Sequence, residues 1–263
     1  MQVTIVLQCG RVGSVSIVHA LQEAGVRNVY HIHKIAVDQI REDLRSHMDH
    51  AVPVDLLWSA AFALLIDQGL KIDIVCPVRE PISRDMSMLL YGVTDVTAAG
   101  GVDGLVASFV ARRKDFASDW INKHLKLPFH LECVERTFDR SAGFGVTERG
   151  DVRVLMLQHE LDARAKGQAI SDFLRLRTPL TIERRNETVL PASQREVFRA
   201  ALEALEPEQV GYDWEIAQDF YRRETLLAEL EPLGLARILD LAPRRWRDEA
   251  PVATPQARLV GLP

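Results

Sequence analysis

The chain has 263 residues, of which 47% are hydrophobic and 26% are charged, and its formal net charge at pH 7 is −5. The hydrophobic content is ample for a buried core, and the length suits one α/β domain with additions better than two small domains. The acidic balance argues against a general nucleic-acid-binding protein, although it leaves room for a local basic pocket. We predict a single domain over residues 1–240 and a loosely ordered tail over 241–263, where arginine, proline and small residues are frequent.

The three cysteines, Cys9, Cys76 and Cys133, are far apart in the sequence, and two of them lie in strand-like runs. Isolated thiols of this kind are typical of a reducing compartment and predict neither a disulfide framework nor a metal cluster. No signal peptide precedes the first apolar run, and the longest run, residues 56–65, is shorter than the roughly 20 residues of a membrane span. We therefore expect a cytoplasmic protein with no membrane span and no nucleic-acid partner. Its oligomeric state stays open.

The predicted elements alternate along the first half of the chain. Apolar runs predict strands over residues 3–7, 26–33, 71–78 and 152–159. Helical spacing predicts helices over 17–24, 37–47, from 53 to near 69, from 81, and over 106–125, 169–176, 193–205 and 214–230. A loop is expected over 92–104, and a β-hairpin or irregular excursion over 128–149. Strands separated by helices indicate βαβ units and a central parallel sheet, whose ligands bind beyond the carboxyl ends of the strands.

The stretch that follows the first strand predicts a site for an anion. The apolar run breaks at Gly10, and the chain then continues through Arg11, Val12, Gly13, Ser14, Val15 and Ser16 into a helix. At such a junction, unpaired backbone N–H groups and the positive end of the helix dipole converge on one point. The alternative is an ordinary strand–helix turn whose glycines serve geometry alone.

This glycine loop differs from two common phosphate-binding loops. A Walker A loop has four residues between its glycines and a lysine before the hydroxyl residue, and neither is present at Gly10–Ser14. The Gly-x-Gly-x-x-Gly of dinucleotide-binding folds is not matched either. The order Gly10-Arg-Val-Gly-Ser-Val-Ser16 instead resembles the phosphosulfate-binding loop of sulfotransferases, which reads roughly Gly-Lys-Val-Gly-Ser-Thr-Ser in the carbohydrate branch. Arginine here replaces the family's lysine at position 11, and valine replaces a hydroxyl residue at position 15.

Arg79 and Ser87 form a second anchor for an anion. Arg79 follows the third strand, and Ser87 lies eight positions later in the predicted helix. A dianionic phosphate is well bound by a guanidinium and a hydroxyl donor, and sulfotransferases hold the 3′-phosphate of their donor with this pattern. Arg79-Glu-Pro-Ile-Ser-Arg84 also resembles the Arg-Asp-Pro-Ile-Ala-Arg of the bacterial capsule-associated branch. The alternative is a solvated helix start where Arg79 pairs with Glu80 or Asp85, and Arg84 is expected to face solvent.

A histidine pair lies at the end of the second predicted strand. His31 and His33 are two residues apart, so they project to one face of a strand, and an imidazole can accept a proton near neutral pH. Tyr30-His-Ile-His33 resembles the Tyr-His-x-His of uronyl 2-O-sulfotransferases, in which a histidine is the base toward the sugar hydroxyl. Its position at the strand exit favours His33 as the base and His31 as an orienting or substrate-contacting neighbour, with Lys34 adding positive charge. Core histidines bonded to backbone are the alternative, and a zinc site lacks a third ligand at suitable spacing.

Arginines complete the set of predicted site residues. In the resembling families, a lysine at the position of Arg11 contacts the bridging oxygen and the sulfuryl group. An arginine stabilises that charge but does not donate a proton, so a leaving phosphate that needs no proton, slower catalysis, and a site that only binds all stay open. Arg184 and Arg185 resemble the late basic loop that closes over the donor, with a solvated charge cluster as the alternative.

Together, these resemblances imply a P-loop-NTPase-like three-layer α/β sandwich with a central parallel sheet and additional C-terminal helices. They imply a sulfotransferase that uses 3′-phosphoadenosine 5′-phosphosulfate (PAPS), requires no metal, and acts on a hydroxyl acceptor, with a carbohydrate expected. The acceptor pocket is expected in the variable loops 92–104 and 128–149. A divergent nucleotide kinase or hydrolase and a catalytically silent nucleotide-binding protein are the alternatives.

Overall fold

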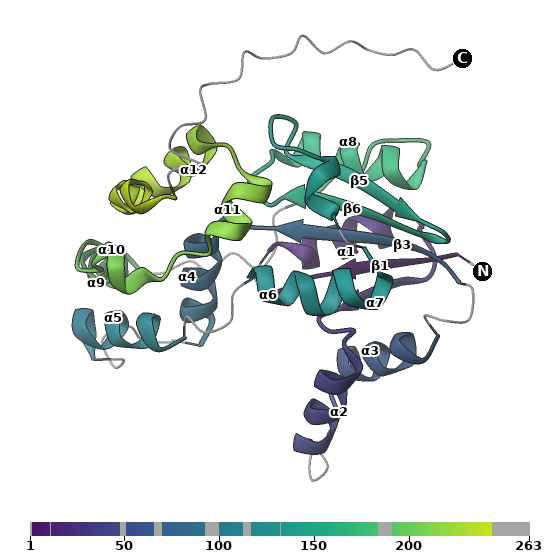
Figure 1. The fold of residues 1–263 in the computed structure, drawn as a ribbon, viewed down its shortest axis with the longest axis horizontal. Coiled ribbons are helices and arrows are strands. Elements are labelled where there is room, and N and C mark those ends of the chain that lie inside the picture. Colours follow the sequence, from purple (N-terminus) through teal and green to yellow (C-terminus); the bar gives the residue numbers. More distant parts are fainter. Residues whose placement is uncertain are drawn as a thin grey trace.

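The fold is built on a six-stranded mixed β-sheet with helices on both faces (Figure 1). The computed structural model describes residues 2–10, 12–47, 51–65, 70–92, 100–112, 117–131, 133–183 and 191–243. The strands are β1 (Gln2–Leu7), β2 (Val29–Ile32), β3 (Lys71–Val78), β4 (Phe138–Asp139), β5 (Phe144–Arg149) and β6 (Val152–Gln158), in the spatial order β2-β1-β3-β6-β5-β4.

The sheet is parallel in four of its strands only. β2, β1, β3 and β6 pair in parallel, as the alternation of strands and helices predicts. The hairpin of β4 and β5 lies within the predicted 128–149 excursion, but it joins the main sheet because β5 pairs antiparallel with β6. The prediction of a wholly parallel central sheet is therefore corrected to a mixed sheet. The second strand is also shorter than predicted, since 26–28 precede it and His33 follows it.

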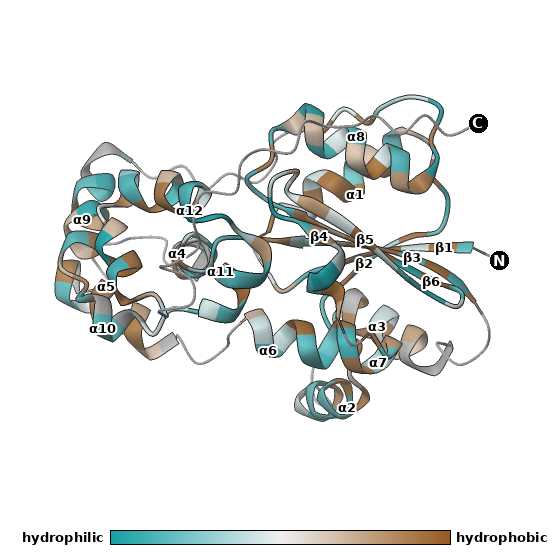
Figure 2. Ribbon diagram, turned by 45° about the horizontal axis from the view of Figure 1, so that its top comes forward, coloured by the Kyte–Doolittle hydropathy of each residue, from teal (hydrophilic) through white to brown (hydrophobic). Residues whose placement is uncertain are grey.

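Both faces of the sheet are buried, because successive residues of each strand point to opposite sides. Val6 of β1 and Val75 of β3 pack with α1 (Ser14–Glu23) and α8 (Ala163–Leu174) on one face. On the other face lie α3 (Val54–Leu65), α6 (Ala117–Ile121), a π-helix (Asn122–Lys126) and α7 (Leu127–Phe129), as Figure 2 shows. The chain is thus an α/β protein whose sheet is covered on two sides.

A group of helices lies beyond the carboxyl ends of the strands (Figure 2). It comprises α4 (Pro81–Gly92), α5 (Gly101–Arg112), α9 (Ala192–Glu203), α10 (Pro207–Val210), α11 (Trp214–Phe220) and α12 (Arg223–Leu230), followed by 3₁₀ turns at Glu231–Leu233 and Ala236–Leu241. One hydrophobic cluster runs from Val78 of β3 to Phe220 and Leu230 of this group. The helices and the sheet therefore share one core, while α2 (Val37–Ser46) packs with α3 at the second face.

Several helix bounds differ from the sequence prediction. The helix predicted over 106–125 corresponds to α5 and to a continuous helical run of α6, the π-helix and α7, and residues 113–116 lie outside the described ranges. α8 starts earlier than predicted because the Asp162 side chain accepts hydrogen bonds from the N–H groups of Arg164 and Ala165, which caps its first turn. The helix predicted over 214–230 is interrupted at Tyr221, whose backbone is extended.

Two predictions concern the C-terminal tail and membrane-spanning helices. Of the tail predicted over 241–263, all residues from 244 onward lie outside those that the structure describes. Among the described helices, none is both long and apolar enough to cross a lipid bilayer.

Candidate functional site

The strand order brings the glycine loop and the Arg79 segment to one edge of the sheet. β1 lies between β2 and β3, so the chain leaves β1 toward one neighbour and later returns on its other side. In parallel sheets, ligands bind at such a switch point, outside the carboxyl ends of the strands. Val6 of β1 is in register with Val75 of β3, so Gly10, three residues after β1, and Arg79, directly after β3, follow neighbouring strands that end at the same edge.

Helix α4 packs directly against the glycine loop. Gly10 has a backbone φ of +92°, and a Cβ built on it would lie 3.1 Å from Sδ of Met88, the residue after Ser87. Arg84 of the same helix interacts with the Cys9 side chain and forms an ion pair with Asp85 at 2.6 Å. The prediction that Arg84 faces solvent is wrong, because it is only 7% exposed between α4 and the end of β1.

The N-terminus of α1 has the features of an anion-binding site. Gly13 precedes the helix with a φ of +73° and has no side chain to cap the first-turn N–H groups. Ser14 is 2% exposed, and its Oγ lies 2.9 Å from Nε2 of His31. Ser16, in the first turn of the helix, is also buried, and Val15 between them is half-buried. The positive end of the helix dipole, the first-turn N–H groups of α1 and the hydroxyls of Ser14 and Ser16 thus lie together where the glycine loop meets α1.

His159 fixes the glycine loop from the end of β6. Its Nδ1 donates to the carbonyl oxygen of Val12 at 3.0 Å, and its backbone N–H donates to the carbonyl of Val78 at 2.6 Å. A Cβ on Gly13 would lie 2.7 Å from His159 Cε1, so only glycine fits there without displacing the ring. Sequence spacing gives no sign of this role, but the position of His159 at the end of the strand predicted over 152–159 is a signal that could have suggested it.

The two histidines of the predicted pair lie side by side but contact different partners. Their ring centroids are 5.0 Å apart. His31 contacts Ser14 of the glycine loop, whereas the His33 ring nitrogens are both 3.0 Å from Nε2 of Gln8. The backbone carbonyl of His33 accepts a hydrogen bond from Trp120 Nε1 at 2.9 Å. His31 is therefore tied to the loop, and His33 to the first residue after β1.

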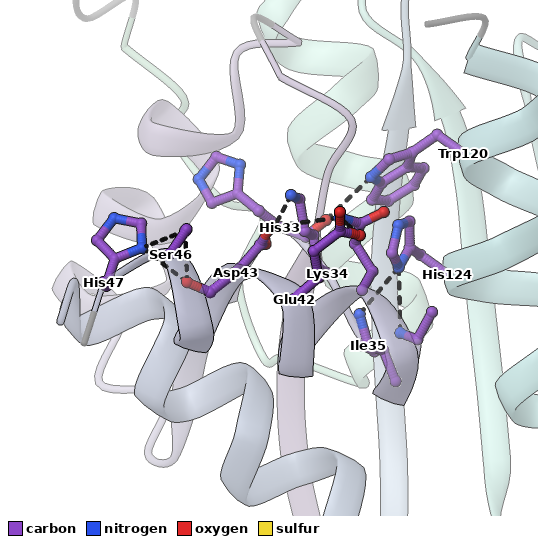
Figure 3. Close-up of polar contacts among 11 residues, drawn as sticks. His33, Lys34, Ile35, Glu42, Asp43, Ser46, His47, Trp120 and His124 are labelled. Atoms are coloured by element: carbon purple, nitrogen blue, oxygen red, sulfur yellow. Dashed lines mark hydrogen bonds and ion pairs between the residues drawn. The ribbon is translucent and has the colours of Figure 1, made fainter.

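The chain beyond His33 is held by side chains of α2 and of the π-helix (Figure 3). Lys34 Nζ forms an ion pair with Asp43 at 2.7 Å, which balances the positive charge that Lys34 was expected to add. His124 Nδ1 accepts hydrogen bonds from the backbone N–H groups of Ile35 and Ala36, both at 3.1 Å. A nitrogen that accepts two hydrogen bonds carries no proton, so His124 is neutral in this arrangement.

The surroundings of His124 favour this neutral form. The side chain is 3% exposed, and burial lowers its pKa to about 4, with smaller contributions from the positive charges of Lys34 and Lys123. His124 therefore stabilises the turn between β2 and α2 in its uncharged state.

Arg79 lies beside two carboxyl groups that the sequence pattern does not connect, Glu80, which is fully buried, and Glu160, which is half-buried. Glu80 accepts hydrogen bonds from the N–H groups of Ile82 and Ser83, at 3.1 and 2.6 Å, and so caps α4. Glu160 accepts the backbone N–H of Glu80 at 2.9 Å. Burial raises the pKa of Glu80, raises that of Glu160 to about 7, and lowers that of Arg79. The alternative of a solvated helix start, where Arg79 pairs with Glu80 or Asp85, is wrong at Glu80, which is 0% exposed, while Arg79 is half-buried.

Two tyrosines connect this charge group to the C-terminal helices. The Tyr212 hydroxyl donates to Glu80 at 2.9 Å, and the Tyr221 hydroxyl donates to Glu160 at 2.8 Å. Both tyrosines are buried, and burial raises their pKa values well above the usual range. The segment around α11 therefore determines the polarity around Arg79, although it is more than 100 residues away in the sequence.

The structure describes only some of the remaining predicted site residues. Arg11, Arg184 and Arg185 lie outside the described residues, so their predicted roles stay predictions. Ser87 lies on α4, half-buried, next to Met88. No group of three or more histidine, cysteine, aspartate or glutamate side chains is arranged for a metal ion within the described ranges.

A depression at the opposite, amino edge of the sheet has a volume of about 430 Å³. Its polar lining includes Lys71 and Asp73 of β3 and Arg153 of β6, and Asp73 and Arg153 form an ion pair at 2.7 Å. The predicted site residues that the structure describes lie at the other edge, so this depression is separate from them.

No family model, curated protein or solved structure matches the chain in the three comparisons with known proteins. Its function is therefore argued from the residues at the carboxyl edge of the sheet.

Proposed function

We propose that the protein is a sulfotransferase, which moves a sulfuryl group from PAPS to the hydroxyl of an acceptor, with a carbohydrate as the expected acceptor class. The observation that carries the proposal is the packing of α4 on the glycine loop. It brings the two segments for which we propose anion binding, the start of α1 and the Arg79–Ser87 segment, to neighbouring positions at the switch point of the sheet. A donor with phosphates at both ends of an adenosine needs two such segments.

The start of α1 suits the phosphosulfate end of the donor. Its first-turn N–H groups, together with the hydroxyls of Ser14 and Ser16, would donate hydrogen bonds to anionic oxygens. Arg11 would stabilise the charge on the sulfuryl group and the leaving phosphate, as the loop resemblance implies.

Arg79 and Ser87 would hold the 3′-phosphate. Arg79 shares its surroundings with the carboxyl groups of Glu160 and Glu80, so a bound dianion would be attracted to the guanidinium and repelled by the two carboxylates. Because burial raises the pKa of Glu160 to about 7, a dianion beside it would favour the protonated carboxyl and reduce that repulsion.

In this proposal His33 is the general base. It removes the proton of the acceptor hydroxyl while the oxygen forms a bond to sulfur and the bond between sulfur and the phosphate oxygen breaks. The products are the sulfated acceptor and adenosine 3′,5′-bisphosphate. His31, which contacts Ser14, orients the loop hydroxyl rather than the acceptor.

Calorimetric titration with adenosine 3′,5′-bisphosphate, without Mg²⁺, tests the proposal. We expect the bisphosphate to bind more tightly than adenosine 5′-monophosphate. Arg79→Gln should weaken bisphosphate binding by about 10- to 100-fold, because a hydrogen bond to a charged group contributes about 1.5–3 kcal/mol. The same variant should leave binding of the monophosphate nearly unchanged. Arg177→Ala, an exposed arginine after α8, is the matched control and should change neither.

The outcomes separate the proposal from its alternatives. Transfer of radiolabelled sulfate to a hydroxyl acceptor, lost in His33→Ala, supports the enzyme. Binding of the bisphosphate without transfer to any member of a broad acceptor panel would favour a silent nucleotide-binding protein. Binding of ATP that requires Mg²⁺, with no affinity for the bisphosphate, would replace the proposal with a kinase or hydrolase.

A further inference from the structure

His159 is fixed at the end of β6 and lies against the glycine loop. Its backbone is held on both sides, because its N–H donates to the Val78 carbonyl at 2.6 Å and its carbonyl accepts a hydrogen bond from Lys166 Nζ at 2.7 Å. Its ring meets Gly13 edge-on, since a Cβ on Gly13 would lie 2.7 Å from Cε1 and 2.8 Å from Nδ1 of the ring. The end of β6 therefore determines where this imidazole lies.

The hydrogen bond from His159 to the loop has one possible direction. A carbonyl oxygen has no proton to donate, so the 3.0 Å contact between Nδ1 and the carbonyl oxygen of Val12 places the proton on Nδ1. In the neutral imidazole, Nε2 then carries the lone pair. His159 is thus a donor to the backbone of the glycine loop, and the contact requires the Nδ1–H tautomer.

The loop needs a donor at this place because its backbone can turn at Gly13. Reversing the Val12–Gly13 peptide changes ψ of Val12 and φ of Gly13, and glycine adopts positive and negative φ about equally readily. The observed φ of Gly13 is +73°. The glycine alone therefore does not select an orientation of this peptide, and the hydrogen bond from His159 does.

The selected orientation decides which backbone group lies next to the first-turn N–H groups of α1. In a planar trans peptide the carbonyl and the N–H point to opposite sides. Because the Val12 carbonyl points to His159, the Gly13 N–H points away from that ring, and it donates to no other residue in the described part of the chain. A reversed peptide would turn the carbonyl oxygen to that side, where its partial negative charge would repel an anion.

We infer that His159 is a positioning residue of the anion-binding site: its hydrogen bond holds the Val12–Gly13 peptide with the carbonyl toward the end of β6 and the N–H available to an anion at the start of α1. The anion, which is the 5′ end of the donor, rests on the proposed function. The orientation of the peptide does not, and it can be measured in the free protein.

NMR of isotope-labelled full-length protein tests the orientation without a ligand. Above the usual imidazole titration range, His159 should show the Nδ1–H tautomer. The residual dipolar coupling of the Gly13 N–H should agree with the structure in the wild type and in His159→Asn, whose side-chain amide can donate in place of Nδ1. His159→Leu has nearly the shape of the asparagine variant but no donor, and we expect the Gly13 coupling to depart from the structure.

Calorimetric titration tests the consequence for binding. His159→Leu should weaken the binding of adenosine 5′-monophosphate about 3- to 10-fold, which is the effect of losing one neutral hydrogen bond. Adenosine 3′-monophosphate, whose phosphate would engage Arg79, should change less than twofold, and His159→Asn should bind both nucleotides nearly as the wild type does. His19→Leu, which replaces a half-buried histidine on α1, is the matched control and should change neither.

The Nε2–H tautomer of His159 in the wild type overturns the inference, as does a Gly13 coupling that is the same in the wild type and in His159→Leu. An equal loss of affinity for the two monophosphates in His159→Leu also overturns it, because a merely structural role would weaken both. If no adenosine phosphate binds the wild type while the NMR results are as expected, the proposed function fails and the role of His159 in orienting the peptide stands.

Discussion

His124 gives the most direct quantitative test of the structure. It is neutral because its Nδ1 accepts two backbone N–H groups, and burial lowers its pKa from an ordinary 6.5 to about 4. The folded state therefore binds fewer protons than the unfolded state between these two pH values. The stability that His124 contributes is complete above about pH 6.5 and is lost progressively as the pH falls toward 4.

The magnitude follows from the two pKa values. Each pKa unit corresponds to about 1.4 kcal/mol, so the whole effect is about 3 kcal/mol, of which about 2 kcal/mol is lost by about pH 5. No large correction for solvent screening applies, because His124 is 3% exposed.

Glu160 acts in the opposite direction in the wild type. Its pKa is raised from 4.5 to about 7, so proton binding at this carboxyl favours the folded state as the pH falls over the same range. The contributions of His124 and Glu160 therefore oppose each other, so the pH dependence of the wild type alone does not isolate His124.

The informative quantity is the difference in the free energy of unfolding between the wild type and His124→Asn. The asparagine amide oxygen can replace Nδ1 as an acceptor, but it does not titrate. In urea unfolding, the wild type should exceed His124→Asn in free energy of unfolding by about 2 kcal/mol less at pH 5 than at pH 7.5. A difference that is independent of pH would refute the neutral, doubly accepting His124.

Two further substitutions test the packing around the site. Gly13→Ala should destabilise the protein by about 1–2 kcal/mol, because alanine is strained in the left-handed backbone conformation, and by a further 1–3 kcal/mol, because its Cβ would contact His159. Gly25 has a similar φ of +74° and no atom near its Cβ. Gly25→Ala should therefore cost only the about 1–2 kcal/mol of backbone strain. Equal losses in chemical denaturation would contradict the close approach of His159. Tyr212→Phe should cost about 1.5–3 kcal/mol, because buried Glu80 loses a hydroxyl donor, while Tyr30→Phe, whose ring packs on Trp58 and Phe62, serves as the control. Similar small changes in both would show that the Glu80–Tyr212 hydrogen bond contributes little.

The sequence alone was sufficient for elements whose signal is local. β3 has the bounds predicted from its apolar run, because a buried parallel strand is recognised by composition within a few residues. The presence of a helix after the glycine loop was also predictable from local spacing, although α1 starts at Ser14, three residues before the predicted range 17–24. In the same way, the strand-exit positions of the glycine loop, His31, His33 and Arg79 follow from the order of the elements.

Tertiary structure decided the features that depend on distant partners. Arg84 is buried rather than solvated because α4 packs against the end of β1, which no helical periodicity reveals. β5 joins the main sheet only because its partner is β6. His159 contacts Val12, 147 positions away in the sequence, and so clamps a loop to which no sequence pattern connects it.

The sequence by itself thus determined which residue types follow each strand, because strand and helix signals are carried by neighbouring side chains. Only the tertiary structure decided which of them touch: Gln8 with His33, Ser14 with His31, and Tyr212 with Glu80. The physical reason is that burial and hydrogen bonding, which set charge states and tautomers, depend on chain segments that meet only after the sheet has formed.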